Sequence, residues 1–590
     1  MSYIKLSRIE GLVWNVNEVN ENEVFETKYF LTNSIDKKKE IELIINRIDF
    51  RYHKHFIIFG LKYIELIKQI YKHKTPYSSI IIIEIIEENS NEICFEGIEK
   101  DLFFLSDKTV SLILGCDQEI GRQLDVAFSD SLKLYNLRNI EVITMPYVKS
   151  KYPKQLNNVL DVIFQKLRSA IVSYGNDVED ILIGMDNYIN NWKHVFRGVD
   201  CKFFKDVYKG KPAIIVGAGP SLDKNIDALK SIKDKAVICS VDGAINTLLN
   251  NGIYPNVVSS LERVELTAKF YENKSIPEDI IYVGPNVVLG SILDKFSRII
   301  FTGRYGDALF RELNDNLGFT NLDVGINVSN VLISFARHMG CFPIIFVGMD
   351  LAYTNGKTHT TSFSENFDDK FMSSYKKNTV YVKGQNGEML ESFEHFMHTK
   401  SWIESKIASD KEGLYINATE GGANIAGAEN KSLIDTILAY CVEDKLLKIT
   451  EIYDKIIDEN VLDQNCITEK AINFFEDLTE FYNKIVKETE ISYDTLNNYN
   501  RLGKLELHEK LRLSLDSTLN ENFAGRFIIQ SIIINYKRDL QSFPMALDKN
   551  NEGLLYKKSL LYFETLSAVS NKVKENIELY KQVLKSHITK

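Results

Sequence analysis

The chain has 590 residues, of which 44% are hydrophobic and 26% are charged. This length exceeds what one hydrophobic core supports, so we expect about two to four domains. The formal net charge of −10 and the isoelectric point near 5.7 exclude a generalised nucleic-acid-binding surface, although a local pocket can still take a small anion. The seven cysteines are scattered and form no Cys-x-x-Cys pair, which predicts neither a disulfide framework nor a zinc site.

The N-terminal sequence has no basic segment followed by the apolar run of a signal peptide. No uninterrupted apolar stretch reaches the length of a membrane span. We therefore expect a cytoplasmic protein that is not inserted in a membrane.

Residues 1–190 predict a first, smaller α/β domain. The sequence HFIIFG at 55–60 predicts a strand that ends in glycine, and apolar residues at helical spacing follow at 61–71. Further strands are predicted at 79–86, 110–114 and 140–145. Glu84 lies at the distance where a dinucleotide fold keeps its ribose-binding acid, but a single glycine in the turn favours a scaffold over a nucleotide site.

The most informative stretch is residues 213–222, an apolar run that breaks into Gly-Ala-Gly-Pro-Ser and then into helical sequence. We interpret it as a buried strand, a turn that holds a phosphate, and a helix. Gly217 and Gly219 would let the backbone approach a ligand, with Pro220 in the turn and Ser221 as helix cap. The third glycine of a dinucleotide fingerprint and the Gly-Lys-Ser/Thr of a P-loop are both missing, so a purely structural turn stays an alternative.

From residue 211 onward, apolar strands alternate with helices, which predicts a Rossmann-like, mostly parallel sheet in a central domain at residues 191–435. The strands are expected at 236–241, 257–261, 280–283, 298–302 and 344–347. Ligands of such sheets bind beyond the carboxyl ends of the strands. Asp242, Asn286 and Asp350 follow strands and are therefore candidate ligand-binding residues.

The second informative stretch is residues 346–359, a strand followed by a polar loop. Asp350 could bind ribose hydroxyls, Tyr353 or Lys357 could neutralise a leaving phosphate, and His359 could act as general acid or base. A helix cap is the alternative for an aspartate after a strand, and simple solvation is the alternative for a loop histidine.

Two further polar stretches could face the same crevice. Asn327 or Ser329 could cap the helix that precedes the strand at 344–347. The loop at 417–427 carries Thr419, Glu420 and two glycines, Gly421 and Gly422, which either make turns or let the loop approach a substrate.

From residue 436 to 590 the pattern changes to uninterrupted helical periodicity, which predicts an α-helical C-terminal domain. The run at 505–515 fits helix or strand spacing, but its glutamate and lysine content favours helix. Helix packing is the simplest interpretation of the apolar stripes, and a docking surface for a protein substrate is the alternative.

The motifs GAGPSL at 217–222, VGMDLAYTNGKTH at 347–359 and NATEGGANIAG at 417–427 occur in this order between an α/β domain and a helical region. This combination resembles the bacterial motility-associated factor (Maf) glycosyltransferases. The resemblance implies transfer of a nonulosonic acid, of the pseudaminic or legionaminic type, from a CMP-sugar to Ser or Thr of flagellin. It further implies a sialyltransferase-like central domain that needs no metal or cofactor besides the donor, and it leaves a homo-oligomer open.

Carried over to this sequence, the resemblance places residues in three groups. CMP would be bound by Gly217, Gly219, Pro220, Ser221, Asp242 and Asn286. The catalytic residues would be Asp350, Tyr353 and His359, with His359 accepting the flagellin hydroxyl proton. The remaining substrate contacts would come from Asn327, Ser329, Lys357, Thr419, Glu420, Gly421 and Gly422.

Two other functions remain open at this stage. One is a pterin pyrophosphokinase, because an archaeal enzyme of that kind resembles the central domain, and this reaction would need ATP, magnesium and clustered carboxylates. The other is a flagellin-binding accessory protein that keeps the fold without transfer chemistry.

Overall fold

The computed structural model describes residues 3–588 in two compact units. Its gaps are residues 9–13, 20–36, 51–53, 76–77, 88–91, 97–98, 117–118, 122, 125–139, 173–176, 273, 355, 365–378, 443–444, 499–503, 542 and 544–548. The first unit consists of Met1–Asn176, Thr489–Leu513 and Gln530–Leu566. The second consists of Asp177–Glu488, Ser514–Ile529 and Ser567–Lys590.

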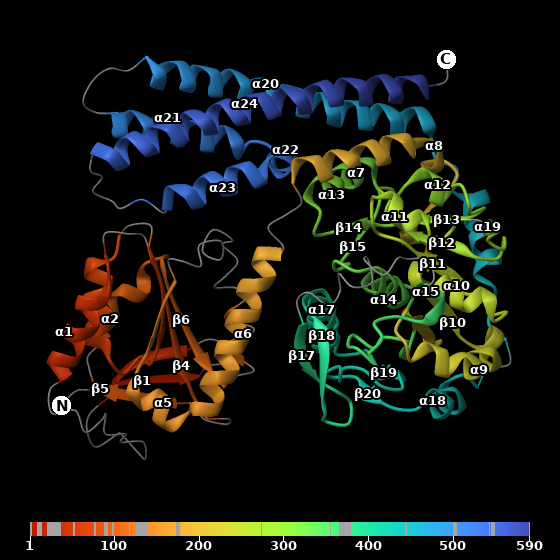
Figure 1. Ribbon diagram of the computed structural model, residues 1–590, viewed down its shortest axis with the longest axis horizontal. Helices are drawn as coiled ribbons and strands as arrows, with labels where there is room; N and C mark the ends of the chain where they lie inside the picture. Colours follow the sequence, from red (N-terminus) through yellow and green to blue (C-terminus); the bar gives the residue numbers. More distant parts are fainter. Residues whose placement is uncertain are drawn as a thin grey trace. The chain divides into compact units, whose positions relative to one another are not determined.

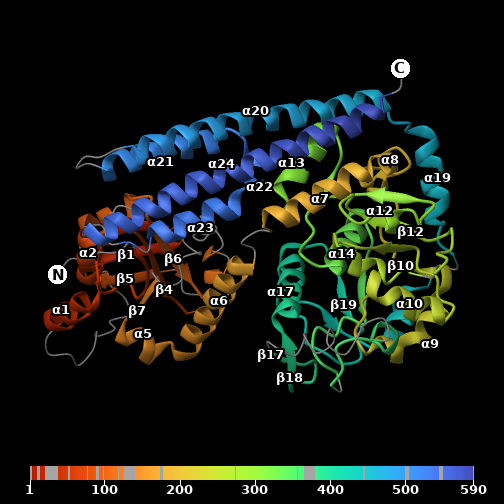
Figure 2. The ribbon, with the colours of Figure 1, turned by 45° about the horizontal axis from the view of Figure 1, so that its top comes forward.

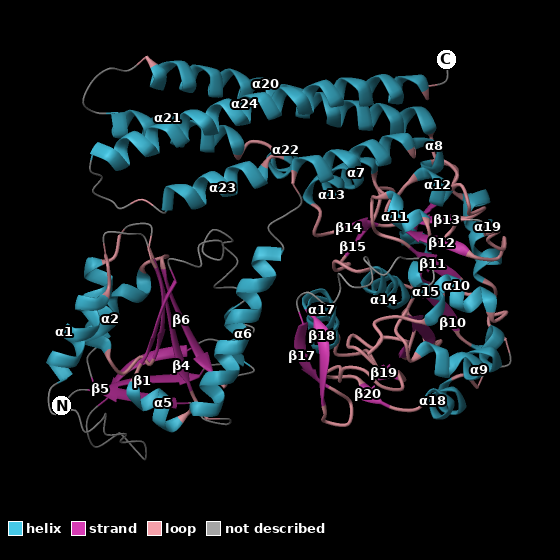
Figure 3. Ribbon diagram, in the orientation of Figure 1, coloured by secondary structure: helices cyan, strands magenta, loops and turns pink. Residues whose placement is uncertain are grey.

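The first unit contains a parallel four-stranded sheet (Figure 3), which confirms the predicted N-terminal α/β architecture. The strands are β3 (His55–Phe59), β4 (Ser79–Ile85), β6 (Val110–Gly115) and β7 (Ile140–Thr144), in the order β6-β4-β3-β7. Helices α2 (Ile64–His73), α5 (Pro146–Lys151) and α6 (Pro153–Val172) accompany them. The isoleucine-rich strands β3 and β4 are buried along their whole length, as expected for a sheet covered on both faces.

Glu84, at the end of β4, is occupied by contacts within this unit. One oxygen of its carboxyl group accepts hydrogen bonds from the hydroxyl of Tyr147 and from the amide of Leu61, both at 2.5 Å. The side chain is 2% exposed, and burial raises its pKa. Glu84 therefore ties β4 to the segments after β3 and β7, which agrees with the scaffold interpretation.

The sequence analysis did not predict the antiparallel three-stranded sheet of the first unit. It consists of β1 (Tyr3–Arg8), β2 (Trp14–Val19) and β5 (Glu92–Glu96), in the order β2-β1-β5. Helix α1 (Lys37–Arg47) and the 3-10 helix η2 (Glu99–Ser106) complete the described N-terminal elements.

The second unit is organised around a nine-stranded sheet in which every described pairing is parallel (Figure 1). Its strands are β8 (Val199–Asp200), β9 (Ala213–Val216), β10 (Val237–Val241), β11 (Val257–Ser259), β12 (Ile281–Gly284), β13 (Ile299–Phe301), β16 (Ile344–Val347), β19 (Tyr415–Asn417) and β20 (Glu429–Asn430). The order is β20-β19-β16-β9-β10-β11-β12-β13-β8. This confirms the predicted Rossmann-like parallel sheet.

The chain direction across this sheet reverses at β9. From β9 the chain steps outward through β10, β11, β12 and β13, and it then returns to the opposite side of β9 to form β16 and β19. The boundary between β9 and β16 is therefore the topological switch point, where ligands of open α/β sheets bind. The edge strand β8 was not among the strands predicted from the sequence.

Helices and two small strand pairs surround this sheet. The helices are α7 (Val178–Asn190), α8 (Trp192–Val195), η4 (Cys201–Phe204), α9 (Leu222–Ile232), η5 (Lys233–Lys235), α10 (Asp242–Asn250), α11 (Glu265–Ala268), α12 (Gly290–Leu293), α13 (Ala308–Leu317), α14 (Val328–His338), α15 (Thr361–Ser364), α17 (Glu394–Ser409), α18 (Leu433–Tyr440) and α19 (Ile449–Glu459). The strand pairs are β14 (Gly303–Arg304) with β15 (Asn321–Leu322), and the hairpin β17 (Thr379–Lys383) with β18 (Met389–Phe393). The main core lies between the central strands and these helices.

The C-terminal region is helical, as predicted. Its helices are α20 (Gln464–Asn497), α21 (Lys504–Leu519), α22 (Phe523–Ile528), α23 (Gln530–Gln541) and α24 (Lys549–Ser586). Figure 2 shows α20 beside α24, and the ring centroids of Phe475 and Tyr580 lie 5.8 Å apart. The predicted apolar stripe of α20 is buried at Ile472, Phe475, Leu478, Tyr482 and Ile485. These side chains pack inside the protein and do not form an open groove.

Residues of α20 and α24 belong to both compact units. Among the described helices, none combines the length and apolar character needed to cross a membrane.

Candidate functional site

A pocket lies at the switch point between β9 and β16. Its described lining consists of residues 217–219, 241–243, 327–329 and 348–351, together with Thr358, His359, Phe363, Phe396 and Thr399. Its volume is about 140 Å³. The pocket brings together seven of the residues that the sequence analysis selected, namely Gly217, Gly219, Asp242, Asn327, Ser329, Asp350 and His359.

Position 219 has to be a glycine, because the loop that follows β16 lies very close to it. The Gly219 amide donates a hydrogen bond of 2.8 Å to the carbonyl of Gly348. A Cβ atom at position 219 would lie 2.1 Å from the Asp350 Oδ2 atom and 2.6 Å from the Gly348 oxygen. The glycine of this turn therefore accommodates a neighbouring loop of the protein itself.

Asp350 binds the turn that precedes α9. Its Oδ2 atom accepts a hydrogen bond of 2.6 Å from the Ser221 hydroxyl, and its Oδ1 atom accepts one of 2.7 Å from the Thr354 hydroxyl. The Ser221 amide lies 3.2 Å from Oδ1. A carboxylate at this position is favourable because it faces the positive end of the helix dipole. Burial raises the pKa of Asp350, and these hydrogen bonds oppose that shift.

The sequence analysis expected the amides of residues 217–221 to hold a phosphate, but most of them already have partners. Gly217 donates to the carbonyl of Val347, Gly219 to Gly348, and Ser221 to Asp350, whereas Pro220 has no N–H group. Ser221 uses its hydroxyl as a donor to Asp350, so its side chain holds this loop. A ligand phosphate at the start of α9 would have to displace a carboxylate.

Two other helices begin at the pocket. Asp242 is the first residue of α10, and its carboxyl group accepts a hydrogen bond of 2.8 Å from the Gly243 amide. Asn327 caps α14, because its side-chain oxygen accepts bonds of 3.0 Å from both the amide and the hydroxyl of Ser329. The predicted capping role of Asn327 is thus confirmed, and a neutral cap leaves the positive end of the α14 dipole uncompensated by a carboxylate.

His359 lies flat against an aromatic ring in this pocket. Its ring is 3.9 Å from that of Phe363 with an interplanar angle of 9°, and its Nδ1 atom lies 3.0 Å from the Thr358 hydroxyl. Burial lowers the pKa of His359 to about 3. The imidazole is therefore neutral at physiological pH, and its proton affinity is weak for a general base.

Several predicted site residues lie outside the described lining of this pocket. Tyr353 is buried, and its amide donates to the Glu391 carbonyl of β18, while Lys357 is exposed in the same loop. Thr419 accepts a hydrogen bond from the Met349 amide. The remaining members of this group are Pro220, Ser221, Asn286, Glu420, Gly421 and Gly422.

The loop at residues 419–422 braces the other loops. The side-chain amide of Gln385 donates to the carbonyls of Thr419 and Gly421 at 2.7 and 2.8 Å. The Ala423 amide donates to the Asp350 carbonyl at 2.7 Å. These contacts agree with the turn-forming interpretation of the loop, and its substrate-binding role stays a prediction.

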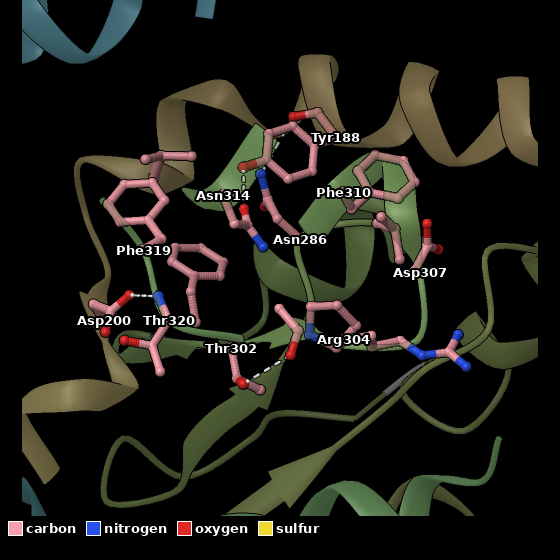
Figure 4. Close-up of a pocket in the computed structure, with 15 residues that line it drawn as sticks. Tyr188, Asp200, Asn286, Thr302, Arg304, Asp307, Phe310, Asn314, Phe319 and Thr320 are labelled. Carbon is pink, nitrogen blue, oxygen red and sulfur yellow. Dashed lines mark hydrogen bonds between the residues drawn. The ribbon is translucent and has the colours of Figure 1, made fainter. Parts of the chain in front are cut away.

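Asn286 lies in a separate cavity at the ends of β12 and β13. Figure 4 shows it among Tyr188, Phe310 and Asn314, and its side-chain nitrogen donates to the Tyr188 carbonyl at 3.2 Å. The cavity volume of about 30 Å³ suits a water molecule or two and is far too small for a nucleotide. The structure therefore does not bring Asn286 to the pocket that Gly217 lines.

Among the lining residues that were not selected from the sequence, three lie after residue 359: Phe363, Phe396 and Thr399. Phe363 lies on α15, and the other two lie on α17, which was not predicted. The hairpin before α17 did carry a signal, because Asn386-Gly387 separates two short runs with β-forming residues. Phe396 had no such signal, since one aromatic residue on a helix is most often part of the core.

The described lining of the pocket contains few ionisable side chains. Its described lining contains no lysine or arginine, and its acidic groups are Asp242 and Asp350. Burial raises the pKa of Asp242 to about 7 and shifts that of Asp350 upward. No group of three or more His, Cys, Asp or Glu residues with metal-binding geometry is present in the described part of the chain. The arrangement offers glycine backbone, aromatic rings and helix N-termini to a ligand.

The overall fold has a known counterpart. The structure of MAf glycosyltransferase from Magnetospirillum magneticum AMB-1 matches 97% of this chain and 92% of its own, with a TM-score of 0.60 and 15% identity. The chain has the fold of a Maf glycosyltransferase. The predicted resemblance is thereby confirmed at the level of fold, over both α/β parts and the helical region.

The central unit has a second likeness. Residues 186–356 match the family described as 6-hydroxymethylpterin diphosphokinase MptE-like. The 6-hydroxymethyl-7,8-dihydropterin pyrophosphokinase of Methanocaldococcus jannaschii is 32% identical over 101 residues, which are 17% of this chain and 40% of that enzyme. The match thus spans less than half of the pterin enzyme.

Proposed function

We propose that the protein is a glycosyltransferase that moves a nonulosonic acid from a CMP-sugar to Ser or Thr of flagellin. The observation that carries this proposal is the fold shared with a Maf glycosyltransferase over nearly the whole length of both chains. The pocket at the switch point supports it, because sheets of this type bind nucleotides there.

In the proposed reaction, the oxygen of a Ser or Thr side chain attacks the anomeric carbon of the sugar. The bond from that carbon to the phosphate oxygen of CMP breaks, CMP leaves with the electron pair, and the hydroxyl proton passes to a base. The N-terminus of α14, capped by the neutral Asn327, is the part of the pocket best suited to stabilise the departing phosphate. This site takes the place of the amides of residues 217–221, because those of Gly217, Gly219 and Ser221 already donate hydrogen bonds within the protein.

The test is intact-mass analysis of flagellin co-expressed with this protein and with a pathway that makes CMP-nonulosonate. We expect a mass increase by one or more nonulosonic acid residues, and its disappearance when the modified Ser or Thr is changed to Ala. Cells that make the donor but lack this protein are the control. An unchanged flagellin mass, with the CMP-sugar detected in the same cells, would refute the proposal.

The second candidate is a pterin pyrophosphokinase, favoured by the match of residues 186–356 and by the identity to the archaeal enzyme. It is tested by incubating the protein with ATP, Mg²⁺ and 6-hydroxymethyl-7,8-dihydropterin. Formation of AMP together with the pterin diphosphate would support it. A flagellin-binding protein without transfer chemistry would form no product in either assay while still binding flagellin.

A further inference from the structure

Three rings meet at the switch-point pocket, two from one short segment and one from α17, and we call them the aromatic shelf: His359, Phe363 and Phe396. The rings of His359 and Phe363 are stacked, with centroids 3.9 Å apart. The Phe396 ring, from α17, lies 6.0 Å from His359 at an angle of 59°. His359 and Phe396 thus form two non-parallel walls, and Phe363 backs one of them.

The rings of the aromatic shelf pack against other side chains of the protein. Phe363 is 6% exposed and belongs to a core cluster, where its ring lies 5.3 Å from that of Phe270. A Cβ atom at Gly243 would lie 2.9 Å from the Phe363 ring, so this ring rests directly on the backbone at the start of α10. On the other wall, the rings of Phe396 and Phe393 are 4.1 Å apart. Rings fixed in this way lose little conformational entropy when they bind a planar ligand.

The state of His359 suits stacking better than proton transfer. Its surroundings keep the imidazole neutral, and a neutral ring presents a π face without a charge that a ligand would have to compensate. Its Nδ1 atom and the Thr358 hydroxyl, 3.0 Å apart, fix the orientation of the ring.

The other described lining residues point to the same conclusion. The described lining of the pocket contains no lysine or arginine side chain. Stacking of a base on an aromatic ring is worth about 1–3 kcal/mol, and the aromatic shelf offers rings for it.

We propose that the aromatic shelf binds the heteroaromatic base of a nucleotide, and that His359 is a stacking residue of that base site instead of the proton acceptor. The inference rests on the proposed function in taking the base to be the cytosine of CMP. The shelf also lies beyond residues 186–356, so it is not part of the segment that matches the pterin enzyme family.

The first experiment measures binding by calorimetry with the full-length protein. The probes are CMP, AMP, 6-hydroxymethylpterin and, as a ligand without a base, ribose 5-phosphate. The variants are His359→Phe, which keeps a ring but has no proton acceptor, and His359→Leu, which has neither. Tyr381→Leu is the control, because Tyr381 is 64% exposed on β17 and is not part of the described pocket lining. Melting temperatures check that each variant is folded.

We expect CMP to bind more tightly than ribose 5-phosphate. His359→Leu should weaken CMP binding roughly 5- to 150-fold, the effect of losing one stacked base, whereas His359→Phe and Tyr381→Leu should change it little. Equal affinity of wild type and folded His359→Leu for CMP would refute the proposal that the aromatic shelf binds the base. It would not contradict a CMP-sugar as the donor. Binding of only AMP or only the pterin, with the same loss in His359→Leu, would refute a CMP-sugar as the donor. It would still support the proposal that the aromatic shelf binds a base. If none of the probes that carry a base binds at millimolar concentration, both the base site and the CMP-sugar donor are refuted.

The second experiment separates stacking from base catalysis through transfer activity at saturating donor. His359→Phe should keep most of the turnover rate, since a stacking residue acts on donor binding. Loss of a general base instead costs about 100- to 10,000-fold in rate. A loss of that size in His359→Phe, with CMP affinity unchanged, would show that His359 is the proton acceptor and refute the assignment.

Discussion

Replacing Asp242 by Asn should remove a pH-dependent instability from the second unit. Asp242 is 8% exposed at the start of α10, and burial raises its pKa to about 7. Glu262 adds to the shift, and hydrogen bonds from Gly243 and Ser260 oppose it. Asn has nearly the same shape, and its side-chain oxygen can still accept the bond from the Gly243 amide.

The sign and size of the effect follow from proton binding. Between pH 5.5 and 7 the folded protein holds the proton of Asp242, while the unfolded chain has lost it. Because the folded state binds more protons in this window, its stability falls as the pH rises, and it stops falling above the folded pKa. Over these 1.5 pH units the loss is about 2 kcal/mol, at about 1.36 kcal/mol per unit. Asn at this position has no proton to lose.

The assay is urea unfolding of wild type and Asp242→Asn at pH 5.5 and pH 8, followed by tryptophan fluorescence. Trp192 and Trp402 belong to the same compact unit as Asp242. Subtracting the variant from the wild type cancels the titration of all other groups, so the difference should change by about 2 kcal/mol between the two pH values. A difference that stays constant within about 0.5 kcal/mol would show that Asp242 titrates normally, which would refute the argument from burial.

Two further substitutions test the contacts that hold the loops. Gly219→Ala should destabilise the protein by about 1–3 kcal/mol, because the added methyl group overlaps the Asp350 carboxylate. Gly306→Ala, where a Cβ atom meets nothing within 4 Å, is the matched control in the same thermal melt, and equal melting temperatures for the two variants would contradict the steric argument. Tyr147→Phe should cost about 1–2 kcal/mol in urea unfolding and raise the pKa of Glu84 further, because that carboxyl group loses its hydroxyl donor. Unfolding at the wild-type urea concentration would mean that this hydrogen bond has no net effect on stability.

The order and type of most central elements could be read from the sequence. Runs such as Ala213–Val216 and Ile344–Val347 are apolar, β-branched and bounded by turn residues, so each specifies a buried strand through local preferences. The helical periodicity after residue 436 was equally clear. The antiparallel sheet of β1, β2 and β5 was missed, because β1 and β5 do not alternate strictly between apolar and polar residues and the alternation in β2 is short.

The pocket residues that were predicted from the sequence either follow a predicted strand or begin a predicted helix. Asp242 and Asp350 both line the pocket, because each follows a strand and the carboxyl ends of parallel strands lie at one edge of a sheet. The same rule failed for Asn286, since β12 lies three strands away from β9 and its end opens into another cavity. Distance along the sheet depends on strand order, which local patterns do not specify.

What the sequence by itself determined is therefore the set of strands and helices and the glycine turn between β9 and α9. The tertiary structure alone decided what that turn contacts. Pairing of β16 with β9 joins segments that are more than a hundred residues apart in the sequence. It brings the Asp350 carboxyl group to the amide and hydroxyl of Ser221, so this end of the turn binds Asp350 where a phosphate was predicted. It also brought Phe396 to His359, because side chains that are far apart in the sequence meet only after the sheet has been built.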